Sequence, residues 1–229
     1  LKEDVPMDPN IYEAKFYGLG SDGTVGANKN SIKIIGENSD RKVQAYFAYD
    51  SKKSGGFTAS HLRFCKMSIR STYLVTTPNF VACHVPSYLK LYDMTRGLKE
   101  GGTFLLNSIW PKEDVGEHLP IHIKRYFAQK KINFYIINAT KIASEIGLGN
   151  RTNTILQSAF FKISNVIPYD LAVEQMKKFI VKSYGRKGEE IVNKNYKAVD
   201  RGVEYEKVDI PEEWANLKDD VEKAADEVP

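Results

Sequence analysis

Three glycines stand close together near the start of the chain, at the spacing Gly18-x-Gly20-x-x-Gly23. A strand-like run precedes them and a helix-like run follows, which is the context in which such glycines form a phosphate-binding turn. Glycines let the backbone approach an anion, the amides of the turn point inward, and the positive end of the helix dipole lies beneath them. Nearby side chains could bind a phosphate or cap the helix: Ser21, Asp22 and Thr24. The spacing predicts a phosphate-binding turn, and a glycine turn that serves only tight packing is the alternative.

A second candidate is the loop after the next strand-like run, which reads Asp50-Ser51-Lys52-Lys53-Ser54-Gly55-Gly56. In a dinucleotide-binding fold, an acid at the end of the second strand binds a ribose, so Asp50 favours NAD. The adjacent Lys52 and Lys53 instead suit an additional phosphate on the ribose, which both NADP and coenzyme A carry. A solvated basic loop without a ligand is the alternative.

Two weaker constellations remain. Asn150, in the turn before the helix-like run at residues 153–161, could contact a ligand or cap that helix, and capping is slightly favoured. His118 and His122 are four positions apart, but Pro120 separates them and no third ligand is evident. His84 is isolated in the sequence, and no Ser/His/Asp grouping is visible. The sequence therefore predicts no metal site and no catalytic residue.

Composition limits the class of protein. With 229 residues, of which 42% are hydrophobic, the chain is long enough to bury a substantial core. A net charge of only +4 is not typical of a nucleic-acid-binding protein. Cys65 and Cys83 form no CxxC pair, which favours reduced thiols in a cytoplasmic protein. No apolar run approaches the roughly 20 residues of a membrane span. We expect a soluble, cytoplasmic protein with no nucleic acid or membrane as partner.

Alternating strand-like and helix-like runs must position these residues. Strands are expected at residues 15–20, 42–50, 64–69, 73–76, 80–85, 103–110 and 134–138. Helices are expected at residues 24–36, 121–129, 141–146 and 153–161, in the segment that Pro86 opens, and from Tyr169 onward. Residues 15–50 suit a βαβ unit, and the close succession of later strands implies an antiparallel pair. The fold class is α/β, a three-layer α/β/α arrangement with a mixed sheet and a helical C-terminal section.

The expected organisation is a linker at residues 1–14, one α/β domain at residues 15–203, and a linker with a charged tail at residues 204–229. The chain begins at Leu1 rather than at a methionine. We expect it to be a piece of a longer polypeptide.

Four stretches together resemble the pyruvate:ferredoxin (flavodoxin) oxidoreductase family, in the domain equivalent to the separate γ subunit (domain III) of the multi-subunit enzymes. They read KFYGLGSDGTVGANKNSIK from Lys15, AYFAYDSKKSGGFTASHLRF from Ala45, HVPSYLKLYDMTRGLKEGGTFLLNS from His84, and ASEIGLGNRTNTILQSAFFKI from Ala143. The resemblance covers most of the chain, without a large departure in those stretches.

The resemblance implies a fragment of an enzyme that converts pyruvate to acetyl-CoA and passes electrons to ferredoxin or flavodoxin. It implies that this domain binds coenzyme A. Thiamine diphosphate, magnesium and iron–sulfur clusters would lie in other domains of the same polypeptide. The residues expected to hold coenzyme A are Gly20, Ser21, Gly23, Thr24, Val25 and Lys29, with Lys52, Lys53 and Asn150 as further candidates.

Two other functions stay open at this point. The glycines and Asp50 also suit a free-standing NAD(P)-dependent oxidoreductase. The missing catalytic groups suit a scaffold domain that packs between its neighbours.

Overall fold

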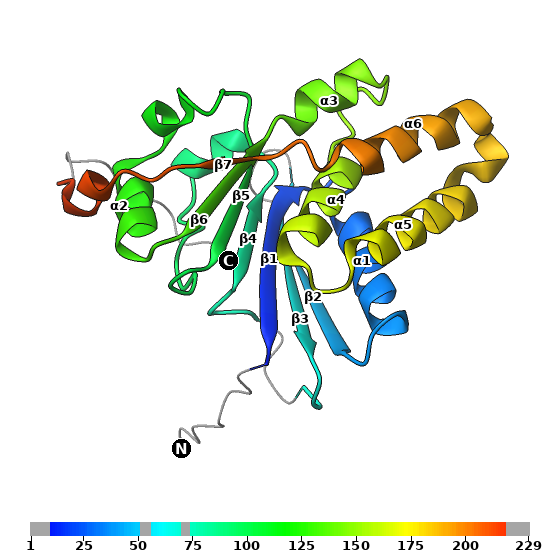
Figure 1. Cartoon of the computed structure of the whole chain (residues 1–229), viewed down its shortest axis with the longest axis horizontal. Coiled ribbons are helices and arrows are strands. Elements are labelled where there is room, and N and C mark those ends of the chain that lie inside the picture. Colours follow the sequence, from blue (N-terminus) through cyan, green and yellow to red (C-terminus); the bar gives the residue numbers. More distant parts are fainter. Residues whose placement is uncertain (1–9, 51–55, 70–73, 219–229) are drawn as a thin grey trace.

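The computed structural model describes residues 10–50, 56–69 and 74–218. Within these ranges, seven strands form one mixed sheet (Figure 1). They are β1 (Tyr12–Leu19), β2 (Lys42–Asp50), β3 (Phe57–Cys65), β4 (Phe80–Cys83), β5 (Thr103–Asn107), β6 (Asn133–Ile137) and β7 (Glu206–Val208). Their order is β2-β3-β1-β4-β5-β6-β7. β1, β4, β5 and β6 run parallel, whereas β3 is antiparallel to both β1 and β2. The expected α/β class and mixed sheet are confirmed. The antiparallel pair expected among the strands after Gly56 does not form as such, because β3 pairs instead with β1 and β2.

Helices and turns cover both faces of the sheet. One face carries α1 (Thr24–Glu37), α3 (Ala139–Glu145), α4 (Asn153–Ser164), α5 (Tyr169–Tyr184) and α6 (Glu189–Arg201). The other carries α2 (Ile121–Gln129) and the short 3-10 turns η1 (Pro86–Lys90), η2 (Val115–His118) and η4 (Glu212–Asn216). Figure 1 shows α2 and α5 on opposite sides of the sheet. Each face buries its own apolar core, so the three-layer arrangement is confirmed.

Local sequence explains the helical layer. In α5, Ala172, Met176 and Ile180 follow one another at four-residue spacing, and all three are buried. In α4, every residue from Ile155 to Phe161 is buried, because this helix lies between the sheet and neighbouring helices. None of the helices in the described part of the chain has the length and apolar character needed to cross a membrane.

The expected βαβ unit is wrong in one respect. β1 and β2 are parallel but not adjacent, because β3 lies between them and pairs with both. The connection from Asp50 to Phe57 is short, which favours an antiparallel partner for β2 over a parallel one. This arrangement brings the start of β3 next to the end of β1.

The helix expected after Pro86 is also wrong. Only the turn η1 forms, and Leu91, which follows it, is 52% exposed. The Asp93 carboxylate accepts hydrogen bonds from the amide and the hydroxyl of Thr95, and such local bonds compete with a helix. Gly97 has φ +79°, and a Cβ there would lie 2.0 Å from the Thr76 carbonyl oxygen.

Three expected strands differ as well. The strand expected at residues 64–69 begins earlier, at Phe57, and ends at Cys65. Residues 74–76 form no strand, and Tyr73 lies outside the described residues. The first strand begins at Tyr12.

The segment after Val203 belongs to the fold instead of forming the expected linker. β7 pairs antiparallel with β6, and Figure 1 shows the chain crossing to the layer that holds α2. There the Arg125 guanidinium donates to the Leu217 carbonyl oxygen (2.9 Å), and the Lys124 ammonium lies 5.4 Å from the Trp214 ring centroid. Three residues of strand gave too weak a pattern to be predicted.

Candidate functional site

The glycine turn lies at the point where the connections from two neighbouring strands leave the sheet on opposite faces. β1 leads into α1 on one face, and its parallel neighbour β4 leads into η1 on the opposite face. The carboxyl ends of the two strands therefore form a topological switch point, the position at which open α/β sheets bind ligands. The expected phosphate-binding turn occupies this position.

Asp22 holds the turn in shape. One of its carboxylate oxygens accepts from the Leu19 amide (2.9 Å) and the other from the Thr24 amide (2.8 Å). Gly23 caps α1 with φ +83°, a left-handed conformation that glycine adopts without strain. A Cβ at Gly18 would lie 2.5 Å from the Thr24 hydroxyl, so the chain can only pass this closely with glycine there.

The surface of the turn is accessible to a ligand. Gly20, Ser21 and Gly23 are exposed, and Val25 is half-buried in the first turn of α1. Amides at a helix start have no carbonyl partner within the helix, so they can bind an anion. Thr24 differs, because its side chain is buried and its amide is bonded to Asp22.

The lysine loop ends beside this turn. The Gly20 amide donates to the Gly56 carbonyl oxygen at 2.6 Å, and a Cβ at Gly20 would lie 3.2 Å from that oxygen. Lys52 and Lys53 lie outside the described residues, but the ends of their loop, Asp50 and Gly56, are fixed beside the turn. The described end of the loop, Gly56, therefore adjoins the glycine turn in the fold.

His84 is a component of the site that the sequence did not reveal. Its Nδ1 lies 2.8 Å from the Thr24 hydroxyl, and its carbonyl oxygen accepts from the Asn107 side chain (3.1 Å). Asn107 in turn accepts from the Ala139 amide at the start of α3. His84 thus links the ends of β1, β4 and β5. The sequence feature that could have identified His84 as a site residue is its position directly after an apolar strand.

The imidazole of His84 is buried, and burial lowers its pKa from 6.5 to about 4 although the Asp22 charge opposes this. The folded protein therefore holds the ring neutral at neutral pH. Its Nε2 has no hydrogen-bond partner among the described residues.

This burial predicts a pH dependence of stability. Below pH 6.5 the unfolded chain binds a proton at His84, whereas the folded chain does so only near pH 4. Stability should therefore fall as the pH is lowered from 6.5 towards 4. Denaturant unfolding at several pH values gives the free energy of unfolding as a function of pH. Its slope should be smaller in the His84→Asn variant than in the unaltered protein, by up to about 1.4 kcal/mol per pH unit. Equal slopes in the two proteins would contradict a neutral, buried His84.

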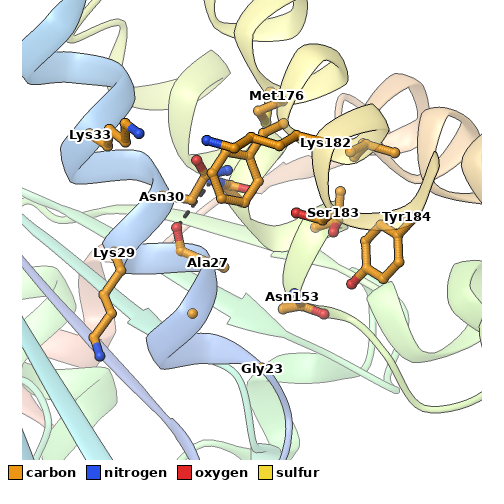
Figure 2. Close-up of a pocket in the computed structure, with 15 residues that line it drawn as sticks. Gly23, Ala27, Lys29, Asn30, Lys33, Asn153, Met176, Lys182, Ser183 and Tyr184 are labelled. Atoms are coloured by element: carbon orange, nitrogen blue, oxygen red, sulfur yellow. Dashed lines mark hydrogen bonds between the residues drawn. The ribbon is translucent and has the colours of Figure 1, made fainter. Parts of the chain in front are cut away.

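A groove lies along the other flank of α1 (Figure 2). Its volume is about 750 Å³, and residues from α1, α4 and α5 line it. Gly23 lies at one end, so the groove adjoins the glycine turn. Lys29 is among the lining residues, but in Figure 2 its side chain points away from α5. Its ammonium lies 5.5 Å from the centroid of the Phe47 ring in β2.

The remaining sequence candidates lie elsewhere. Asn150 is exposed in the turn before α4 and does not line this groove. His118 stacks on Trp110, with ring centroids 4.2 Å apart and an interplanar angle of 9°. Among the described residues, no three His, Cys, Asp or Glu side chains form a group that could hold a metal ion.

Fold and site together define an α/β domain whose glycine turn lies at a topological switch point, at the N-terminus of a helix. A model of the pyruvate ferredoxin/flavodoxin oxidoreductase family matches residues 13–205. The chain belongs to this family.

A relative agrees with this assignment, and a solved structure shares the fold. The chain is 53% identical to the pyruvate:ferredoxin oxidoreductase of Moorella thermoacetica over 231 aligned residues, which cover 100% of the chain and 20% of that relative. The chain thus spans about a fifth of that relative's length. The pyruvate oxidoreductase subunit PORC of Thermotoga maritima shares the fold, with a TM-score of 0.67 and 21% identity over 85% of this chain and 96% of that one.

A third similar protein is the 2-oxoglutarate:ferredoxin oxidoreductase of Magnetococcus marinus, in a structure with 2-oxoglutarate, coenzyme A and succinyl-CoA bound. Its TM-score is 0.60 at 16% identity, over 96% of this chain and 34% of that one. This likeness again concerns the fold.

Proposed function

We propose that this chain is the coenzyme A-binding domain of a pyruvate:ferredoxin or pyruvate:flavodoxin oxidoreductase, which oxidises pyruvate to acetyl-CoA in the cytoplasm. The observation that carries the proposal is the hydrogen bond between Gly20 and Gly56. It fixes the end of the lysine loop against the glycine turn that leads into α1. Amides and ammonium groups are then available to the same phosphorylated ligand.

The residues present fit coenzyme A. Gly20 and Gly23 leave space where a side chain would approach Gly56 or Asn153. Ser21 is exposed at the turn, and Val25 lies in the first turn of α1, so its amide is available to a phosphate. Lys52 and Lys53 would neutralise phosphates, the 3′-phosphate included. Thr24 would act indirectly, since its hydroxyl is hydrogen-bonded to His84.

The domain would contribute positioning and no bond-breaking step. Coenzyme A supplies the thiol that accepts the acetyl group, and this chain would hold the nucleotide end so that the thiol reaches a neighbouring domain. Thiamine diphosphate, magnesium and iron–sulfur clusters would be bound by other domains of the same polypeptide. Ferredoxin or flavodoxin would be the electron acceptor of the whole enzyme.

Calorimetric titration of the 229-residue chain tests the proposal. The Lys52→Ala/Lys53→Ala variant should bind coenzyme A about tenfold or more weakly, because two charge-assisted contacts are removed. The same variant should lose less affinity for 3′-dephospho-coenzyme A, since that ligand lacks one phosphate. The matched control is Lys42→Ala/Lys66→Ala, which removes two exposed lysines at the opposite end of the same β2–β3 hairpin.

Other outcomes would favour the alternatives. Binding of NAD⁺ or NADP⁺ without any response to coenzyme A would indicate a nicotinamide-dependent oxidoreductase. If neither ligand class binds the chain, and coenzyme A also fails to bind the intact polypeptide, a scaffold role would replace the proposal.

A further inference from the structure

The groove beside α1 has a composition suited to an anionic ligand. Three lysines line it, Lys29, Lys33 and Lys182, and no carboxylate is among its lining residues in the described part of the chain. Lys33 comes from α1 and Lys182 from α5, and Figure 2 shows both beside Asn30, where the two helices face each other. Lys33 pairs with Glu37 at 3.8 Å, and both side chains are more than half exposed. Such an exposed pair is weak, so Lys33 remains able to bind a phosphate.

The inner part of the groove contains a hydrogen-bond acceptor without a donor. Asn30 is 8% exposed, and its Oδ1 has no partner among the described residues. A buried polar atom that forms no hydrogen bond is costly, and most such atoms in proteins are satisfied. The oxygen is enclosed in this structure, so a ligand N–H group would satisfy it after the Asn30 side chain turns towards the groove.

The neighbouring wall is rigid. The Gln157 side chain donates to the Ala27 carbonyl oxygen (3.2 Å) and to the Ser31 hydroxyl (2.9 Å), so it fixes α4 against α1.

Apart from Lys182 and Ser183, the α5 side of the groove is apolar or aromatic. It presents Met176 and Ile180, which are buried, together with the half-buried rings of Phe179 and Tyr184. A flat ring can pack on such a surface, and aromatic side chains favour stacked or edge contacts with it. The volume of about 750 Å³ lies within the usual range for sites of small ligands.

We propose that this groove binds the phosphorylated adenosine part of a nucleotide. The adenine ring packs on the α5 side, its 6-amino group donates to Asn30, and Lys33 and Lys182 bind the phosphates. The nucleotide is either a free adenine nucleotide or the nucleotide half of coenzyme A, and the second case rests on the function proposed above. The groove and the glycine turn meet at Gly23, so both cases are compatible with the fold.

ADP is the probe, titrated into the 229-residue chain by calorimetry. The Lys33→Ala/Lys182→Ala variant should bind ADP about tenfold or more weakly than the unaltered chain. The control is Lys178→Ala, which removes an exposed lysine of α5 that pairs with Glu174 and should leave the affinity for ADP unchanged. N6,N6-dimethyl-ADP has no N–H at the 6-position and should bind the unaltered chain less tightly than ADP. In Asn30→Leu this difference between the two ligands should disappear.

Coenzyme A distinguishes the two sources. If Lys33→Ala/Lys182→Ala weakens coenzyme A and ADP in parallel, the groove holds the nucleotide half of coenzyme A. If only ADP is weakened, the groove holds a separate nucleotide.

Other results would overturn the proposal. It fails if ADP does not bind the unaltered chain, or binds the double variant equally well. It also fails if a glutamate-rich peptide occupies the groove and ADP does not. The function proposed above is tested separately, because Lys52→Ala/Lys53→Ala should weaken coenzyme A without Lys33 or Lys182 being changed.

Discussion

Replacing Arg63 with methionine should lower the free energy of unfolding by about 3–5 kcal/mol, as expected when one partner of a buried ion pair is removed. The Arg63 guanidinium lies 2.7 Å from the Glu13 carboxylate, and both side chains are at most 5% exposed. The same guanidinium donates to Gln44 and to the Leu74 carbonyl oxygen. Without it, Glu13 retains a buried charge that has lost its main partner. Denaturant unfolding at neutral pH measures the loss.

The double variant Glu13→Leu/Arg63→Met is the control. It removes both charges, so it should lose less stability than the single change. If the single variant loses less than about 1 kcal/mol, or the double variant loses more than the single one, the ion pair does not have the energetic role assigned to it.

The second large effect is expected from Phe160→Ala, which should also cost about 3–5 kcal/mol. Phe160 of α4 is fully buried, and its ring centroid lies 5.1 Å from those of both Phe16 in β1 and Phe80 in β4. Removing the ring leaves a cavity between the helical layer and the centre of the sheet.

Phe160→Leu retains much of the volume and should cost clearly less. The half-buried Phe179 on α5 provides the comparison, because Phe179→Ala leaves no closed cavity. Equal losses for Phe160→Ala and Phe179→Ala would contradict the central position of Phe160 in the core.

Strong periodic patterns made much of the fold predictable. The helix expected at residues 121–129 coincides with α2, and those at residues 24–36 and 153–161 correspond closely to α1 and α4. The segment after Pro86 has an equally good helical pattern, with Tyr88, Met94 and Leu98 buried. Periodicity does not report that Asp93 bonds to Thr95 or that Gly97 must pass beside Thr76, and those contacts prevent the helix.

Only the parts of the candidate site that consist of residues close together in the sequence could be predicted. The spacing of the glycines identified the turn, because its geometry depends on a few consecutive residues. His84 lies 60 positions from Thr24, and Lys182 lies still farther from Lys33. Such pairs meet only through strand order and helix packing, which a single sequence does not specify.

The short last strand also protects the sheet. An unpaired strand at a sheet edge can hydrogen-bond to another chain and start aggregation. β7 covers the outer side of β6, pairing with Phe134, Tyr135 and Ile136, so this mostly apolar strand is not left open. The Tyr135 and Tyr205 rings, 5.5 Å apart, pack edge to face beside this pairing. The eleven residues from Glu206 to Asn216 that contain β7 and η4 therefore help to keep separate molecules from joining edge to edge.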